Sequence, residues 1–356
     1  MVQIMRRAAL HGSEEPVRVG LIGYGFAGRI FHAPLITATP GLQLKAVMTR
    51  RTAAAGVEMM GAALVPDPQQ LIARADVDVV VIATPNDSHA PLARAALLAG
   101  KHVVVEKPFA LNLPEAEELA ALAARQELML TVFHNRRWDS DFLTLREVVR
   151  RGDVGRPVQL ESHFDRFRPE VLDRWRERGP GSGLWNDLGS HLVDQAVQLF
   201  GRPRALLAEL ASMRDGAQAD DYVHAVLIYD RLRVILHATA LAAAPPPRFV
   251  LHGTEGSFVI HGLDPQEEAL KAGTIPGSSG WGLGTPDGRL IARNGEHPVS
   301  LLAGNYRAFY EGLRDAVRGE AGPPVSLAGS LEVMRLLDAG RESNAGGCRV
   351  MIKDAP

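Results

Sequence analysis

Apolar and polar positions alternate in blocks along the first 135 residues. Short apolar segments bounded by turn residues are predicted strands, and they cover residues 17–22, 42–49, 77–84, 102–106 and 128–133. Stretches with helical spacing lie between them, at residues 68–74, 91–99 and 113–125. The segment 77–84 is apolar at nearly every position, which is typical of a parallel strand covered on both faces. The pattern therefore predicts a doubly wound, parallel Rossmann sheet of the α/β class.

After residue 135 the pattern changes. A helix is predicted at residues 140–151. It is followed by strands with no helix between successive ones, at residues 158–167, 205–211, 222–229, 234–241 and 249–252. Successive strands of this kind predict an α+β unit with an open, mostly antiparallel sheet and helices on one face.

Two more segments complete the predicted organisation. Residues 264–298 are rich in Gly and Pro and are predicted loops. The terminal segment 305–344 is predicted to contain two helices, at residues 305–318 and 327–344. These helices can pack against the first domain. We assign an N-terminal extension to residues 1–15, a first domain to 16–135 and a second domain to 136–356.

Composition excludes several classes of protein. The 356 residues are 46% hydrophobic and 22% charged with a net charge of −2, which gives no bias toward nucleic acid or an anionic membrane. The apolar runs are too short to span a bilayer, and no apolar segment follows Arg6 and Arg7 as a secretory signal requires. The single cysteine, Cys348, excludes an internal disulfide and a cysteine zinc site. We expect a cytoplasmic protein without membrane or nucleic-acid partners.

A glycine-rich turn follows the first predicted strand. It reads Gly23-Tyr24-Gly25-Phe26-Ala27-Gly28, and the residues after it can start a helix. In this setting Gly23 permits the tight turn, Gly25 lets the backbone approach a pyrophosphate, and Gly28 lets helix and strand pack closely. The helix N-terminus adds N–H groups and a partial positive charge. The turn, with Phe26 and Ala27, is a predicted dinucleotide site; an ordinary glycine turn is the alternative.

The residues after the second strand bear on which nicotinamide cofactor is used. Domains that use NAD usually place a carboxylate there, against the adenosine ribose. Here the chain reads Met48-Thr49-Arg50-Arg51, and the first acid is Glu58. A guanidinium suits a 2′-phosphate through charge-assisted, often bidentate hydrogen bonds. We therefore predict that Thr49 and Arg50 favour NADP(H) over NAD(H); the alternative is that the arginines are merely solvated.

Two further strand ends carry polar residues to the same edge of the sheet. Thr84-Pro85-Asn86, with His89 nearby, follows the third strand, and Glu106-Lys107-Pro108 follows the fourth. Ligands of open α/β sheets bind at the carboxyl edge. Asn86 and His89 are expected to line the nicotinamide pocket, or else to serve as turn residues. Lys107, held extended by Pro108, is a candidate proton-transfer group; the alternative is a solvated surface lysine.

A polar stripe marks a helix in the second domain. At 100° per residue the stripe comprises Asp187, His191, Asp194, Gln195 and Gln198. Asp187 and His191 are spaced i, i+4, so the carboxylate can orient the imidazole for acid–base chemistry. A solvated polar face and a metal site formed by Asp187, His191 and His163 are the alternatives; we assign no metal.

Together these residues resemble the Gfo/Idh/MocA family of oxidoreductases over nearly the whole chain. The shared segments are the glycine motif, Ala83-Thr84-Pro85-Asn86 with His89, Ala99-Gly100-Lys101-His102, Glu106-Lys107-Pro108 and Asp187-Leu188-Gly189-Ser190-His191. The resemblance implies a nicotinamide cofactor on the first domain and part of the substrate pocket on the second. It also implies catalytic roles for Lys107, Asp187 and His191, and a homodimer or homotetramer formed through the second sheet.

Further stretches resemble the branch of scyllo-inositol dehydrogenases that use NADP. They are Phe31-His32-Ala33-Pro34, Asn135-Arg136-Arg137-Trp138-Asp139-Ser140-Asp141, Asp165-Arg166-Phe167-Arg168-Pro169 and Arg174-Trp175-Arg176. The likeness implies a cyclic polyol or sugar as substrate. We expect Asn135, Arg136, Asp165 and Arg168, together with His191, to meet the substrate hydroxyls.

The expected reaction is reversible oxidation of a secondary alcohol. His191, oriented by Asp187, is assigned as general base, and Lys107 hydrogen-bonds the reacting oxygen and stabilises its charge. The reverse assignment of these two roles stays open. The alternative functions are reduction of a non-sugar aldehyde, ketone or imine, a redox-assisted glycosidase, and an NADP-binding sensor without catalysis.

Overall fold

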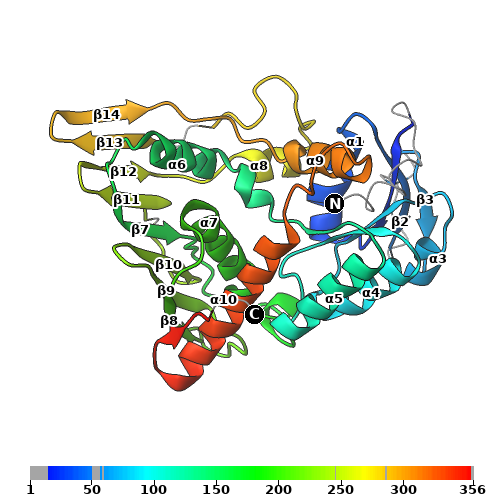
Figure 1. Ribbon diagram of the computed structural model, residues 1–356, viewed down its shortest axis with the longest axis horizontal. Helices are drawn as coiled ribbons and strands as arrows, with labels where there is room; N and C mark the ends of the chain where they lie inside the picture. Colours follow the sequence, from blue (N-terminus) through cyan, green and yellow to red (C-terminus); the bar gives the residue numbers. More distant parts are fainter. Residues whose placement is uncertain (1–14, 50–56, 58–59, 245, 285–286, 354–356) are drawn as a thin grey trace. The chain divides into compact units, whose positions relative to one another are not determined.

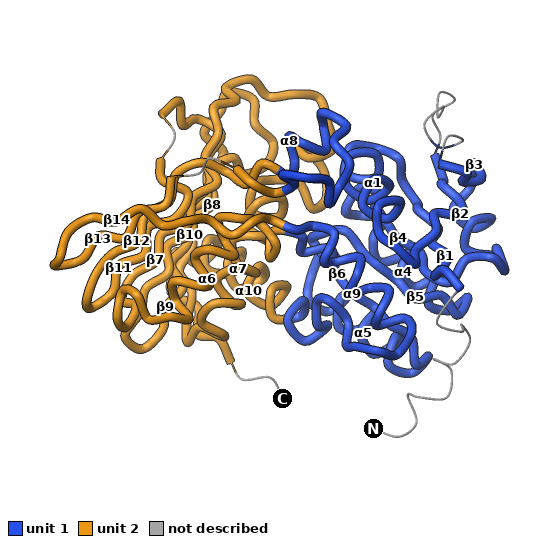
Figure 2. The backbone as a smooth tube through the Cα atoms, turned by 90° about the horizontal axis from the view of Figure 1, so that it is seen from above, with its two compact units in different colours: residues 1–135, 266–281, 305–331 blue, residues 136–265, 282–304, 332–356 orange. Residues whose placement is uncertain are grey.

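A computed structural model describes residues 15–49, 57, 60–244, 246–284 and 287–353. The chain forms two compact units, and each gathers segments that are far apart in the sequence (Figure 2). Unit 1 comprises residues 1–135, 266–281 and 305–331, and unit 2 comprises residues 136–265, 282–304 and 332–356.

Unit 1 is built on a parallel sheet of six strands (Figure 1). The strands, in chain order, are β1 (Val17–Ile22), β2 (Leu42–Met48), β3 (Ala63–Val65), β4 (Val79–Ile82), β5 (His102–Val105) and β6 (Leu130–Val132). Their spatial order is β3-β2-β1-β4-β5-β6, the doubly wound arrangement that the sequence predicts. All four residues of β4 are buried, which explains the unbroken apolar run there.

Among the described residues, helices connect the strands of unit 1, and two further helices, α8 (Gln266–Lys271) and α9 (Arg307–Val317), come from later segments of the chain. The connecting elements are the π-helical segment Gly28–His32, α1 (Ala33–Thr37), α3 (Pro68–Ile72), the 3₁₀ turn Asn86–Ser88, α4 (His89–Leu98) and α5 (Leu113–Arg125). The Asn112 side chain accepts the N–H of Glu115 and so caps α5, while Pro114 occupies the first turn, where no N–H is needed.

Unit 2 contains a sheet of nine strands, seen on the left of Figure 1. They are β7 (Pro157–His163), β8 (Ala205–Ala211), β9 (Tyr222–Ile228), β10 (Arg233–Thr239), β11 (Phe249–Gly253), β12 (Gly256–Ile260), β13 (Gly288–Ala292), β14 (Gly295–Val299) and β15 (Val350–Met351). The spatial order is β14-β13-β12-β11-β7-β10-β9-β8-β15. Strands β7 and β10 are parallel, and the other neighbours are antiparallel, as predicted for a mostly antiparallel sheet.

Helices cover one face of the second sheet. The helical elements of unit 2 are the 3₁₀ turns Asn135–Trp138 and Trp175–Glu177, α6 (Ser140–Arg151), the π-helical segment Trp185–Gly189, α7 (Ser190–Phe200) and most of α10 (Leu327–Gly346). α6 contacts β12 and α7 contacts β10. Residues such as Leu160 and Leu236 are buried on this covered face, while alternate residues such as Glu161 and His237 are half-buried on the other side, here called the open face.

Several elements differ from the sequence-based prediction. Residues 264–298, predicted as loops, contain α8, β13 and most of β14. The short strands β3, β12 and β15 were not predicted. β13 and β14 carry few buried residues, so they lack the period-2 apolar signal that marks a half-buried strand.

Candidate active site

The glycine turn after β1 is required by the fold at two of its three glycines. Gly23 has φ +101°, and a Cβ there would lie 2.3 Å from the carbonyl oxygen of Ala83. A Cβ on Gly28 would lie 2.0 Å from the carbonyl oxygen of Gly23. Both glycines therefore allow backbone segments to pack more closely than any side chain permits.

Gly25 is different, because a Cβ there would meet no protein atom within 4 Å. The fold itself does not explain a glycine at this exposed position. A ligand that approaches the backbone closely does explain it, and the pyrophosphate of a dinucleotide is such a ligand. The side chain of Phe26, 44% exposed, packs edge-on against Phe31 beside this open space. The residues present therefore fit a bound dinucleotide.

Three strand ends meet at one edge of the first sheet. β1, β4 and β5 are parallel neighbours, so the segments that follow them share the carboxyl edge. These segments are the glycine turn, Thr84-Pro85-Asn86 and Glu106-Lys107. Asn86 is buried and Thr84 is half-buried, with its hydroxyl 2.7 Å from that of Ser88.

A chain of hydrogen bonds links the glycine-turn helix to the segment that carries Lys107. The His32 ring lies 2.5 Å from the Tyr310 hydroxyl through Nδ1 and 2.9 Å from Glu106 Oε1 through Nε2. The second carboxylate oxygen, Oε2, accepts the backbone N–H of Lys107 at 3.0 Å. His32 and Tyr310 are fully buried, and the ring of Phe133 packs 4.5 Å from His32. Lys107 is thus attached to a rigid core on one side.

Two groups of this hydrogen-bonded chain, Glu106 and Tyr310, have shifted pKa values. Burial alone would raise the pKa of Glu106, but the hydrogen bond and charge of His32 and the charge of Lys107 outweigh it and lower that pKa. Burial, with the charge of Glu106, raises the pKa of Tyr310 well above its usual value. Both ring nitrogens of His32 are thus occupied, Nδ1 by the Tyr310 hydroxyl and Nε2 by the Glu106 carboxylate, which also accepts the backbone N–H of Lys107.

The His89 ring bridges the segment that follows β4 and the segment that follows β5. Its Nδ1 lies 2.8 Å from the Pro108 carbonyl and its Nε2 lies 3.1 Å from the Thr84 carbonyl. Burial lowers the pKa of His89 and favours the neutral ring, which has one N–H and so donates to one of the two oxygens. The ring is fully buried, so His89 joins the segments that follow β4 and β5 from inside the fold.

Arg50, the residue predicted to bind the 2′-phosphate of NADP, belongs to the segment after β2. Thr49 follows β2, and its N–H donates to the Val65 carbonyl at 3.3 Å. Arg50 and Arg51 lie outside the described residues. The choice between NADP and NAD therefore stays a prediction from the sequence.

In unit 2, the predicted polar stripe is largely buried. His191, Asp194 and Gln195 are at most 5% exposed, so the interpretation of a solvated face is wrong for these three. Asp194 accepts two-pronged hydrogen bonds from Arg137 at 2.6–3.2 Å. Gln195 donates to the Arg136 carbonyl at 2.9 Å and accepts from Arg248 at 2.6 Å. Because these partners hold α7 firmly, His191 stands on a rigid helix.

Asp187 and His191 stand on consecutive helical turns. Asp187 lies in the π-helical segment that leads directly into α7, and the Arg176 guanidinium is 3.8 Å from its carboxylate. Asp187 is half-buried, so the carboxylate is accessible where His191 is almost covered.

The predicted substrate residues differ in burial and in the partners that they contact. Asn135 and Arg136 are buried, and the Arg136 guanidinium bonds Asp139 at 3.2 Å and stacks on Phe164 at 4.9 Å, so it is occupied within the fold. Arg168 is exposed. The assignment of Asp165 needs correction, because Asp165 lies on the other face of the second sheet from α7.

Asp165 lies on the open face of the second sheet. The neighbouring Phe164 points to the covered face, where Arg248 stacks on it at 3.9 Å and reaches Gln195 of α7. Side chains alternate along a strand, so Asp165 and His163 point away from α7. Asp165 therefore cannot share a substrate with His191, and a metal site combining His163 with Asp187 and His191 is excluded on the same ground.

The structure adds residues that the sequence reasoning missed. His32 was noted only within the resembling segment 31–34, and Tyr310 was not singled out. No local pattern links them, since 278 positions separate the two.

Fold and site together define a class of protein: an oxidoreductase with a dinucleotide-binding Rossmann unit and a second unit of α+β type. Two family descriptions match the chain: "Oxidoreductase family, NAD-binding Rossmann fold" over residues 17–134 and "Oxidoreductase family, C-terminal alpha/beta domain" over residues 146–352. The chain belongs to the Gfo/Idh/MocA family of oxidoreductases.

Relatives agree with this assignment over most of their length. The uncharacterized oxidoreductase YdgJ of Escherichia coli is 50% identical, with 92% of this chain and 96% of the relative covered. The scyllo-inositol 2-dehydrogenase (NADP(+)) IolW of Bacillus subtilis is 34% identical, with 95% and 97% covered. A solved oxidoreductase structure from Yersinia pestis is 47% identical and superposes with a TM-score of 0.91, covering 96% of this chain and 99% of that one.

Within the part of the chain that the structure describes, no helix is both long enough and apolar enough to cross a bilayer.

Proposed function

We propose that this protein is an NADP-dependent dehydrogenase that oxidises a secondary alcohol of a cyclic polyol or sugar. The observation that carries the proposal is the chain Tyr310–His32–Glu106–Lys107, which fixes the backbone of Lys107 at the same sheet edge as an open glycine turn. A binding module without catalysis gives no reason for a lysine at this position. The relative named for NADP and scyllo-inositol supports the choice of cofactor and substrate class.

The cofactor preference rests on the sequence after β2. Arg50 would face the adenosine ribose, where its guanidinium suits a 2′-phosphate. Gly25 leaves room for the pyrophosphate, and the N–H groups that follow it supply hydrogen bonds and a favourable dipole. Bound nicotinamide supplies the acceptor for a hydride.

The chain's own residues supply the proton transfer. His191, oriented by Asp187, takes the proton of the alcohol O–H, while the hydride leaves the carbon of the same group, so a carbonyl is formed. The Lys107 ammonium hydrogen-bonds the reacting oxygen and stabilises the negative charge that develops on it. The proposal requires both side chains to reach one bound alcohol. Exchange of the two roles gives the same product and is separated by the pH profiles of the two variants.

The direct test is a spectrophotometric screen of NADP reduction with inositols and aldoses. The active substrate is then given to Lys107→Ala and His191→Ala, which should each lose about 10²–10⁴-fold in turnover, the usual scale for an acid–base group. Lys45→Ala, on β2, and His261→Ala, on the exposed surface, are matched controls and should keep normal turnover. Near-normal turnover of both test variants contradicts the mechanism. Activity only with non-sugar carbonyls or imines contradicts the substrate class and leaves the reaction type intact.

Assembly is a separate proposal. We expect a homodimer or homotetramer formed through the open face of the second sheet, whose half-buried residues include Val226, Ile235 and Val250. Light scattering of the purified chain tests it; a monomer at micromolar concentration contradicts it.

A further inference from the structure

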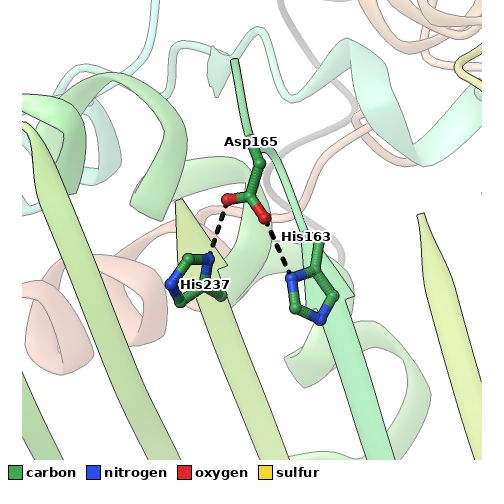
Figure 3. A group of neighbouring side chains, drawn as sticks. All are labelled: His163, Asp165 and His237. Carbon is green, nitrogen blue, oxygen red and sulfur yellow. Dashed lines mark hydrogen bonds and ion pairs between the residues drawn. The ribbon is translucent and has the colours of Figure 1, made fainter. Parts of the chain in front are cut away.

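Three side chains with metal-binding groups meet on the open face of unit 2. His163 ends β7, Asp165 follows two residues later, and His237 lies on β10, directly beside His163 in the parallel pairing of the two strands (Figure 3). One ligand atom from each residue lies within 4.8 Å of the other two. Their side chains are 17%, 4% and 19% exposed, so the group is shielded but reachable.

This cluster has no part in the proposed hydride transfer. It points away from α7, on the opposite side of the sheet from His191. A role for it must therefore be sought in its own chemistry.

The distances within the cluster are close to those of a metal site. Asp165 Oδ2 is 3.1 Å from His163 Nδ1, and Asp165 Oδ1 is 2.7 Å from His237 Nδ1 (Figure 3). Tetrahedral zinc, with ligands at about 2.0–2.1 Å, places its ligand atoms about 3.3 Å apart. Counting one ligand atom from each residue, the three atoms lie within 4.8 Å of one another, so they need to close by at most about 1.5 Å to reach that spacing.

The surroundings hold the ligands as metal sites do. The backbone N–H of Thr239 donates to Asp165 Oδ1 at 3.1 Å and fixes the carboxylate. Glu161 Oε2 lies 3.4 Å from His163 Nε2, the ring nitrogen that faces away from Asp165. A carboxylate on the outer nitrogen favours a proton there and leaves the inner nitrogen free to ligate, which is the usual support of a metal-bound histidine.

We propose that His163, Asp165 and His237 form a binding site for a divalent transition-metal ion, with Glu161 as a positioning residue. Two imidazoles and one carboxylate suit zinc, and also nickel or copper, but not magnesium or calcium, which prefer oxygen ligands. The three side chains leave a fourth position open for a further ligand. The ion cross-links the parallel strands β7 and β10 in the middle of the second sheet.

The test is a calorimetric titration of the full chain, without an affinity tag and freed of metal by a chelator, with Zn²⁺ and then Mg²⁺. We expect one zinc per chain with a dissociation constant of about 1 µM or tighter, and no magnesium heat. Zinc should also raise the thermal unfolding midpoint. No zinc heat, or equal binding of magnesium, overturns the proposal.

Variants locate the ion. His237→Ala should weaken zinc binding by more than about 100-fold, and Glu161→Gln by about 10–100-fold, the range for an outer partner of a ligand. His252→Ala is the matched control, because His252 lies on the same open face on β11, bonded to Ser257, outside the cluster. Circular dichroism confirms that each variant is folded. If His252→Ala lowers affinity as much as His237→Ala, zinc binds elsewhere and the assignment is wrong.

Discussion

Removal of the Tyr310 hydroxyl tests the hydrogen-bond chain behind Lys107. In Tyr310→Phe the His32 Nδ1 loses its hydrogen-bond partner. The Nε2 side of the ring is bonded to the Glu106 carboxylate, so turning the ring toward another partner would break that bond. One buried ring nitrogen is therefore left unsatisfied, which costs about 1–3 kcal/mol of unfolding free energy.

The thermal unfolding midpoint measures this loss, with Tyr229→Phe as the matched control. Tyr229 also donates one hydrogen bond, to the Gly201 carbonyl at 2.9 Å; its side chain is half-buried, but that bond is open to solvent, so water can replace the hydroxyl. We expect Tyr310→Phe to lower the midpoint by about 2–4 °C per kcal/mol lost and Tyr229→Phe to leave it nearly unchanged. Turnover of Tyr310→Phe should fall by up to about tenfold, since about 1.4 kcal/mol in the barrier is tenfold in rate. Equal midpoints for the two variants would refute the reasoning.

Three further predictions concern the cofactor and pH. Gly25→Ala should keep wild-type stability but lose dinucleotide binding, measured by fluorescence titration. Gly28→Ala should unfold at a lower temperature, because its Cβ collides with the backbone. Equal stability of the two variants contradicts the steric argument. Arg50→Ala should weaken NADP more than NAD, and an equal loss for both refutes the phosphate assignment. Burial raises the pKa of Asp220 to about 6, against an ordinary 3.8, so the wild type should lose stability relative to Asp220→Asn as pH rises from 4 to 7, by up to about 3 kcal/mol in denaturant unfolding. If the difference in unfolding free energy between the wild type and Asp220→Asn does not change with pH, the raised pKa of Asp220 is contradicted.

Local signals explain why several elements could be predicted closely. α5 and α6 begin and end where the sequence indicates, at residues 113–125 and 140–151. Asn112 and Pro114 mark the start of α5, and Gly152, with φ +75°, ends α6 in the left-handed conformation that glycine adopts most readily. By contrast, β13 and β14 are formed by pairing with neighbours rather than by an apolar pattern of their own.

The candidate site was predictable only in part. Lys107 and Glu106 follow from their place after a parallel strand, and the glycine turn follows from its spacing. The partner His32–Tyr310 depends on a contact between distant segments, which local periodicity does not encode. Asp165 was misassigned because a motif shows which residues are near in sequence but not which face of the strand each one occupies.

Hydride transfer from a polyol carbon to a nicotinamide cofactor is the reaction proposed for this chain. The most direct measurement incubates the protein and NADP with an inositol that carries deuterium on its ring carbons, followed by mass spectrometry of the reduced cofactor. The reduced cofactor should gain one deuterium, at a rate that Lys107→Ala lowers by about 10²–10⁴-fold. Reduced cofactor that carries no deuterium, or an equal rate in Lys107→Ala, would contradict it.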